Sequence, residues 1–114
     1  MALVLGMTKY TPEATKSLLA EGPTARAAYV TKTMEAMGGK LLGYYFAEGP
    51  DFDVVALIEV PDEMRSSVAA GVAVGALNWS SGMAESMRVT WLTTPEEFEA
   101  ALKAATGLAA PGKE

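Results

Sequence analysis

The polar and charged residues of this protein are better suited to binding a ligand than to catalysing a reaction. The sequence contains no histidine and no cysteine. Their absence excludes a histidine general base, a Ser-His-Asp triad, a thiolate nucleophile, histidine-ligated haem and sulfur-bound zinc. The clustered carboxylates do not follow the spacing of a metal-binding loop: Asp51, Asp53, Asp62 and Glu63. We therefore predict no metal site and no bound cofactor.

Several polar and aromatic side chains could instead hold a small ligand. Tyr45 and Arg88 suit an oxygen-rich molecule, because a phenol donates a hydrogen bond and a guanidinium binds anions through two N–H groups. Arg88 could equally be a charge on an edge strand. Trp79 and Trp91 could stack on a planar ligand or fill an interface between protein copies, where tryptophan is enriched. Asn78 could donate to a carbonyl group or simply shape a turn.

Lys9 and Asp53 are charged residues at the ends of two predicted strands. We expect these strands, the first and third, to be adjacent and parallel, which predicts no direct pair between the two side chains. One interpretation makes Asp53 a cap of the hairpin and Lys9 a solvated surface charge. The other makes both part of a pocket wall near Tyr45. The predicted ligand-binding residues are Lys9, Tyr45, Asp53, Arg88 and Trp91.

The elements that must position these side chains can be read from hydrophobic spacing and from turn residues. Apolar or alternating runs predict strands over residues 2–10, 40–47, 52–60 and 83–92. Helix starts are indicated at Thr11-Pro12-Glu13, at Pro61-Asp62-Glu63 and at the capping box Thr94-Pro95-Glu96-Glu97. The first helix pauses at Gly22-Pro23 and stops at Gly38-Gly39.

The second helical region contains a segment with no charged or strongly polar residue, VAAGVAVGAL at 68–77. A helix that is apolar all round is normally buried on more than one side. Ten residues cannot span a membrane, so a second copy of the chain is the expected neighbour on the side that the sheet does not cover.

The element order is β-α-β-β-α-β-α, and its first six elements match the split βαβ pattern of the ferredoxin-like fold. This predicts a single α+β domain over residues 1–106, with a four-stranded antiparallel sheet, helices on one face, a C-terminal helix and a flexible tail at 107–114. The other sheet face stays uncovered unless a partner covers it, which is unfavourable at about 25 cal/mol per Å² of apolar surface. We therefore expect a homodimer or a higher homo-oligomer.

An ordered set of short motifs along the chain resembles the GYD domain family. The motifs are Lys9-Tyr10-Thr11, Arg26, Gly38-Gly39-Lys40-Leu41, Phe52-Asp53-Val54-Val55 and Glu59-Val60-Pro61-Asp62. The resemblance implies a ferredoxin-like domain in a dimeric α/β-barrel type of assembly, and no established activity. The motif that names the family departs here: Gly-x-Tyr-Asp is replaced by Gly49-Pro50-Asp51-Phe52-Asp53, so the turn is one residue longer and the tyrosine hydroxyl is missing.

Charge and hydropathy limit the partners. The net charge of −5, with no cluster of basic residues, argues against a nucleic-acid partner. The N-terminal residues do not form a signal peptide and no apolar run is long enough for a bilayer, so we expect a cytoplasmic protein.

Three functions are candidates for this domain. The first is a non-enzymatic, self-associating protein that binds a small ligand. The second is a cofactor-independent monooxygenase or cyclase of the dimeric α/β-barrel type, acting on an aromatic or polyketide-like compound through Tyr45, Arg88, Asn78 or Trp91. The third, a trimeric nucleotide sensor, lacks basic phosphate-binding residues and ranks last. The sequence leaves open whether the protein is an enzyme.

Overall fold

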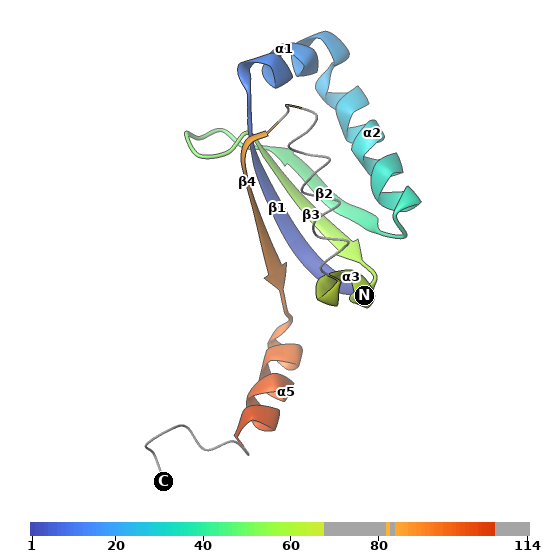
Figure 1. The fold of residues 1–114 in the computed structure, drawn as a ribbon, viewed down its shortest axis with the longest axis vertical. Coiled ribbons are helices and arrows are strands. Elements are labelled where there is room, and N and C mark those ends of the chain that lie inside the picture. Colours follow the sequence, from blue (N-terminus) through green and yellow to red (C-terminus); the bar gives the residue numbers. More distant parts are fainter. Residues whose placement is uncertain (68–81, 83, 107–114) are drawn as a thin grey trace.

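The computed structural model describes residues 1–67, 82 and 84–106. Its elements are β1 (Ala2–Tyr10), α1 (Pro12–Glu21), α2 (Pro23–Ala36), β2 (Lys40–Phe46), β3 (Val54–Val60), α3 (Asp62–Ser66), β4 (Ala84–Leu92) and α5 (Pro95–Ala105). The four strands form one antiparallel sheet in the order β2-β3-β1-β4 (Figure 1). This arrangement confirms the predicted α+β, ferredoxin-like class.

Local signals in the sequence set most of the element boundaries. Thr11 caps α1 by accepting a hydrogen bond from the Ala14 backbone N–H. Gly22 has a φ of 99°, a conformation that side chains disfavour, and it separates α1 from α2, which restarts at Pro23. The predicted pause in the first helix is therefore confirmed as a break between two helices.

Helices α1, α2 and α3 lie on one face of the sheet, and two small apolar clusters form the core there. One cluster lies where the start of β1 meets the end of β3, and it also includes residues of α3 and β4. Its members are Ala2, Val4, Val60, Ile58, Met64 and Trp91. The other lies under α1: Tyr10, Ala14, Val54, Leu18 and Tyr44. The apolar side of β3 that the alternation predicted (Val54, Ala56, Ile58 and Val60) thus faces the helices.

The expected direction of the third strand was wrong. β1 and β3 are antiparallel, with Thr8 opposite Val54 and Ala2 opposite Val60. The physical reason is the connectivity: the helical crossover returns the chain so that β2 runs in the same sense as β1, and the hairpin then reverses β3. The end of β1 therefore lies beside the start of β3.

Two local details depart from simple alternation and side-chain capping. The pairing of β2 with β3 shifts between Leu41 and Gly43, so Leu42 does not share a face with Tyr44 and Phe46 through simple alternation. Pro61, rather than Asp62, occupies the N-cap position of α3, and it makes no side-chain capping hydrogen bond.

Some predicted features lie outside the described residues. These are the apolar helix at 68–77, Asn78, Trp79 and the tail at 107–114. Among the helices that are described, none combines the length and the hydropathy needed to cross a bilayer.

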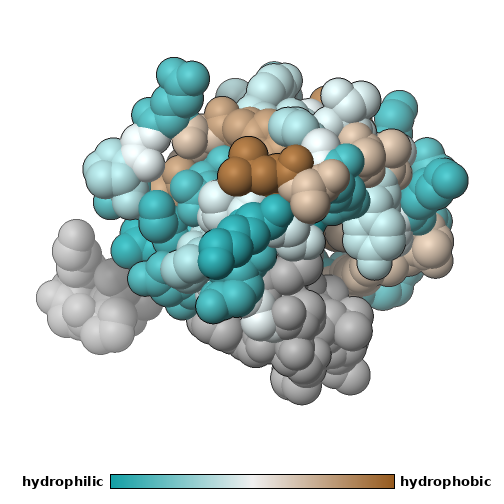
Figure 2. Space-filling view, turned by 90° about the horizontal axis from the view of Figure 1, so that it is seen from above, coloured by the Kyte–Doolittle hydropathy of each residue, from teal (hydrophilic) through white to brown (hydrophobic). Residues whose placement is uncertain are grey.

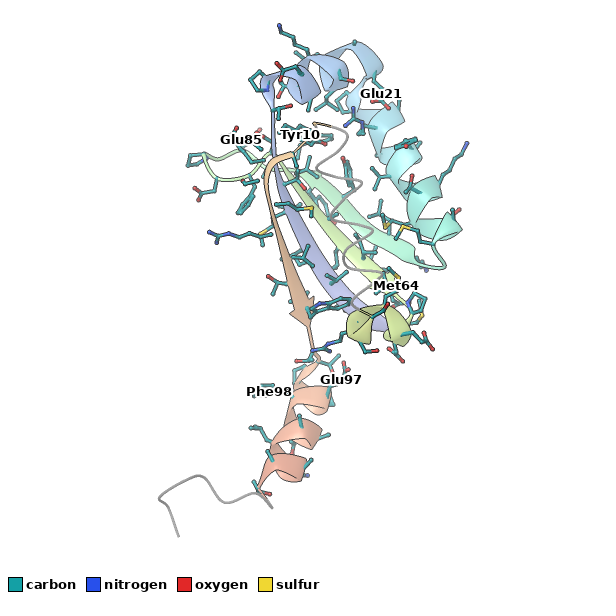
Figure 3. The ribbon with its side chains drawn as sticks, in the orientation of Figure 1. Tyr10, Glu21, Met64, Glu85, Glu97 and Phe98 are labelled. Carbon is teal, nitrogen blue, oxygen red and sulfur yellow. The ribbon has the colours of Figure 1, made fainter. Side chains whose placement is uncertain are left out.

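Helix α5 follows β4 and projects from the end of the sheet (Figure 1). The predicted capping box is present: the Thr94 hydroxyl accepts from the Glu97 N–H at 3.1 Å, and the Glu97 carboxylate accepts from the Thr94 N–H at 3.0 Å. Phe98 and Leu102 are 58% and 53% exposed, and Phe98 lies far from the sheet core in Figure 3. The apolar stripe of α5 therefore has little cover from the part of the chain that the structure describes.

Candidate functional site: an open sheet face and a buried polar cluster

The sheet face opposite the helices carries apolar residues in its middle. In an antiparallel sheet, residues directly opposite one another project to the same face. The strand pairings therefore define three rows across this open face, each running from β2 to β4: Tyr45, Val55, Met7 and Arg88; Gly43, Leu57, Leu5 and Thr90; Lys40, Glu59, Leu3 and Leu92. The two central strands are largely apolar here, and charged or polar side chains stand at the margins.

Lys9 and Asp53 form a direct ion pair at one end of this face. The Lys9 Nζ lies 3.5 Å from the Asp53 Oδ1, so the expectation of no direct pair was wrong. Because β1 and β3 are antiparallel, the last residues of β1 meet the first residues of β3. Asp53 also accepts a hydrogen bond from the Tyr10 N–H at 2.8 Å through Oδ2, and its own N–H donates to the Thr8 carbonyl at 2.9 Å. Asp53 thus connects the hairpin to β1 through two hydrogen bonds.

Arg88 lies on the neighbouring strand, beside the same end of the sheet. Its guanidinium carbon is 5.9 Å from the centroid of the Phe52 ring, a distance at which a cation is attracted by an aromatic face. An open hollow of about 370 Å³ lies between the hairpin and β4, lined by Asp51, Phe52, Ser86, Met87 and Arg88. This hollow offers a cation, a carboxylate, a hydroxyl and an aromatic ring to a small molecule.

The structure does not bring all five predicted ligand-binding residues together. Tyr45 lies on the opposite edge strand from Arg88, three strand spacings away, which is roughly 14 Å. The Tyr45 ring lies close over Gly43 of its own strand. Trp91 pairs with Val4 and packs in the core on the helix-covered face, with the Arg65 guanidinium 5.7 Å from its ring centroid. Only Lys9, Asp53 and Arg88 gather in one region.

A second group of polar side chains lies on the other face, between the sheet and the helices. We call Tyr10, Glu21, Arg26 and Tyr44 the inner polar cluster. The Arg26 Nε donates to the Glu21 Oε2 at 2.7 Å, and the guanidinium carbon lies 5.9 Å from the Tyr10 ring centroid. The Tyr10 and Tyr44 hydroxyl oxygens are 3.3 Å apart. Figure 3 shows Tyr10 and Glu21 at the same end of the molecule, where β1 meets the two helices.

Arg26 is the most buried charged side chain among the described residues, at 5% exposure. Its Nη1 is buried and has no hydrogen-bond partner in the part of the chain that the structure describes. Burial by itself lowers the pKa of Arg26, but the Glu21 hydrogen bond and the nearby Tyr10 outweigh it, so the net pKa is raised. Arg26 therefore stays charged, with one group of N–H donors unused.

Tyr44 is kept in its neutral form by its surroundings. Burial is the largest cause that raises the pKa of Tyr44, and the hydrogen bond with Tyr10 adds to it. The hydroxyl remains a hydrogen-bond donor at any physiological pH.

Sequence reasoning missed the inner polar cluster, although one signal was present. Arg26 stands four residues before Val30 and eight before Met34, in line with the apolar stripe of α2. A charged residue in line with the apolar residues of a helix indicates that its side chain is buried against a polar partner. Its partner Tyr10 is distant in sequence, and only the tertiary structure brings the two together.

Comparison with known proteins gives a family for the chain. Among the described residues, no group of three or more acidic, histidine or cysteine side chains could hold a metal ion. No curated protein matches the sequence. The GYD domain model matches residues 5–102, which is most of the chain and includes the inner polar cluster and all of the open face except Leu3. The chain therefore belongs to the GYD domain family.

Proposed function

We propose that this GYD domain protein is a homo-oligomer whose open sheet face packs against a second copy, and that it binds a small ligand at the margin of that face. The observation that carries the proposal is the apolar middle of the open face, formed by Leu3, Leu5, Met7, Val55 and Leu57. An apolar centre with a polar rim is the usual anatomy of a protein–protein interface.

A second copy of the chain suits this face better than an unrelated partner. Its margins carry both signs of charge, with Arg88 and Lys40 on the edge strands and Glu59 between them. A two-fold axis brings each patch onto its own copy, so a face with both signs can pair cations of one copy with anions of the other. The exposed stripe of α5, with Phe98 and Leu102, adds further apolar surface for such a contact.

The ligand part of the proposal rests on the hollow beside Arg88. A volume of about 370 Å³ suits a small organic molecule. Arg88 and Ser86 can donate hydrogen bonds to ligand oxygens, and the Phe52 ring offers an apolar wall. A partner packed on the adjacent face would close one side of the hollow and exclude water from it.

The enzymatic alternative finds no matching geometry among the described residues. A monooxygenase or cyclase that used Tyr45, Arg88 and Trp91 would need these side chains around one cavity. Tyr45 and Arg88 instead lie at opposite edges of the open face, and Trp91 packs on the other side of the sheet. The proposal therefore assigns no catalysis.

The test is a comparison of molar mass by light scattering for the wild type, Leu5→Lys and Leu19→Lys. Leu5 stands in the middle of the open face, whereas Leu19 is an apolar residue of α1 that is 77% exposed. Figure 2, seen from the α1 end, likewise shows hydrophobic residues at the surface among hydrophilic ones. We expect at least twice the chain mass of 11.9 kDa for the wild type and Leu19→Lys. Leu5→Lys should give the single mass with an unchanged circular dichroism spectrum.

Two results would contradict the proposal. One is a wild-type protein that stays monomeric at tens of micromolar. The other is a folded Leu5→Lys variant that keeps the wild-type mass.

A further inference from the structure

The hollow beside Arg88 is lined by a cation and a carboxylate that do not pair with each other. Arg88 and Asp51 both line this space of about 370 Å³, yet the ion pairs that join described residues include neither of them. Two opposite charges that line one open space without meeting leave a gap between them. A molecule that fills this gap can contact both charges.

The surroundings leave these two charges available to a ligand. The Arg88 guanidinium carbon lies 5.9 Å from the centroid of the Phe52 ring. An aromatic face attracts the charge of a guanidinium without occupying its N–H donors as a carboxylate would. Lys9 of the neighbouring strand β1 is already in an ion pair with Asp53, at 3.5 Å. Arg88 and Asp51 are therefore the charges that a molecule in the hollow would meet.

The charges of the hollow favour a ligand that carries both signs. A simple anion would be attracted by Arg88 and repelled by Asp51, and a simple cation would meet the reverse. A zwitterion can place its carboxylate on the guanidinium and its ammonium group on the carboxylate, and both contacts are charge-assisted hydrogen bonds. The hollow is also lined by Phe52 and Met87, which suit an apolar substituent.

We propose that the hollow beside Arg88 binds a free α-amino acid with an apolar side chain. The amino-acid carboxylate accepts from the Arg88 guanidinium, and its ammonium group donates to the Asp51 carboxylate. This inference names the ligand class for the small-ligand site proposed above and rests on that proposal. A second copy packed on the adjacent open face would exclude water from both charged contacts and so strengthen them.

The experiment is a calorimetric titration of the whole protein with L-phenylalanine and L-leucine. Whichever binds more tightly is compared with two analogues that each lack one charge. The analogue without the ammonium group is 3-phenylpropionate or 4-methylpentanoate, and the analogue with a neutral amide in place of the carboxylate is L-phenylalaninamide or L-leucinamide. We expect saturable binding of at least one amino acid, and about tenfold weaker binding, or more, of both its analogues.

Variants test the two charged contacts separately. Arg88→Gln and Asp51→Asn should each weaken amino-acid binding by about tenfold or more. Asp51→Asn should also reduce the preference for the amino acid over the ammonium-free acid to about threefold or less, because the repulsion of that acid is removed. Both side chains are exposed, so we expect both variants to fold, and circular dichroism checks this.

The matched control is Glu85→Gln, which makes the same change of charge as Asp51→Asn. Glu85 is an exposed carboxylate near the start of β4 (Figure 3) and does not line the hollow. Glu85→Gln should leave amino-acid affinity unchanged. A loss in Glu85→Gln as large as that in Asp51→Asn would show a general effect of net charge and overturn the assignment of the ammonium group to Asp51.

Three further results would overturn the inference. Equal affinity for the amino acid and the ammonium-free acid would exclude the zwitterion class but leave a small-ligand site beside Arg88, as proposed above. Unchanged affinity in either Arg88→Gln or Asp51→Asn would remove one of the two contacts. The absence of saturable binding of both amino acids would exclude the ligand class, while light scattering on the same samples reports self-association independently.

Discussion

The carboxylate of Asp53 accepts a hydrogen bond from the backbone N–H of Tyr10 at 2.8 Å, and so joins the start of β3 to the end of β1. Tyr10 is buried and is the last residue of its strand. Its side chain enters the inner polar cluster on one side of the sheet, while Lys9 pairs with Asp53 at the margin of the open face. One carboxylate therefore supports the strand ends from which both candidate sites are built.

Asp53→Ala should destabilise the protein by about 2 kcal/mol, because it leaves the Tyr10 N–H without its acceptor. Lys9→Met should cost under about 0.5 kcal/mol, since a partly exposed ion pair contributes little. Urea denaturation measures both, with Asp51→Ala as the matched control at an exposed neighbour. Equal losses of unfolding free energy in Asp53→Ala and Asp51→Ala would show that the hydrogen bond between Asp53 and Tyr10 does not stabilise the fold.

Tyr44 predicts a loss of stability in alkaline solution. Its pKa in the folded protein lies above the ordinary value of 10.0, chiefly through burial. The folded state therefore resists deprotonation, and the stabilisation that is present below about pH 10 is lost as the pH rises toward the folded pKa. Urea denaturation from pH 8 to 11 should show a smaller decline for Tyr44→Phe than for the wild type.

The control for this alkaline effect is Tyr45→Phe, at an adjacent residue that is 66% exposed on the open face. Absorbance at 295 nm should show the last tyrosine of the wild type titrating late, and that step should disappear in Tyr44→Phe alone. A wild-type decline that persists unchanged in Tyr44→Phe would be the contrary result.

The capping box of α5 predicts local rather than global effects. Thr94→Ala removes the hydroxyl that accepts from the Glu97 N–H, and backbone amides of α5 should exchange roughly fivefold faster with deuterium. Every residue of α5 is exposed, so the urea midpoint of the sheet should not move. If Thr94→Ala lowered the stability of the sheet, measured by urea, as much as that of α5, measured by amide exchange, α5 would unfold together with the sheet.

The same cap should weaken in acid. The backbone hydrogen bond from Thr94 lowers the pKa of Glu97 below its ordinary value of 4.5. The capping contribution is therefore complete above about pH 4.5 and is lost as the pH falls through the folded pKa. Amide exchange in α5 at a series of pH values, corrected for intrinsic rates, should show this loss in the wild type and not in Glu97→Gln.

Gly39 predicts a steric limit at the turn between α2 and β2. A Cβ at this position would lie 2.9 Å from the backbone oxygen of Glu59, which is held in the sheet. Gly39→Ala should therefore cost about 2 kcal/mol through overpacking. Gly49→Ala, where a Cβ meets open space, should change the unfolding free energy by about 0.5 kcal/mol or less and can stabilise the hairpin loop.

The parts of this protein that depend on neighbouring residues can be predicted from its sequence. Thr11 and Thr94 marked helix starts, Gly22-Pro23 marked a break, and alternation marked the four strands. These signals are local hydrogen bonds and backbone preferences, which act over three or four residues. The family motifs, read in order, likewise identify the domain.

Which distant residues meet depends on how the whole domain is connected and packed. Strand direction, which follows from the connectivity of the whole domain, joined Lys9 to Asp53 and overturned the expected separation. Sheet order put Tyr45 and Arg88 at opposite edges, and face alternation put Trp91 in the core. Packing of α2 on the sheet buried Arg26 beside Tyr10. Such contacts join segments far apart along the chain, and a spacing rule within one element cannot contain them.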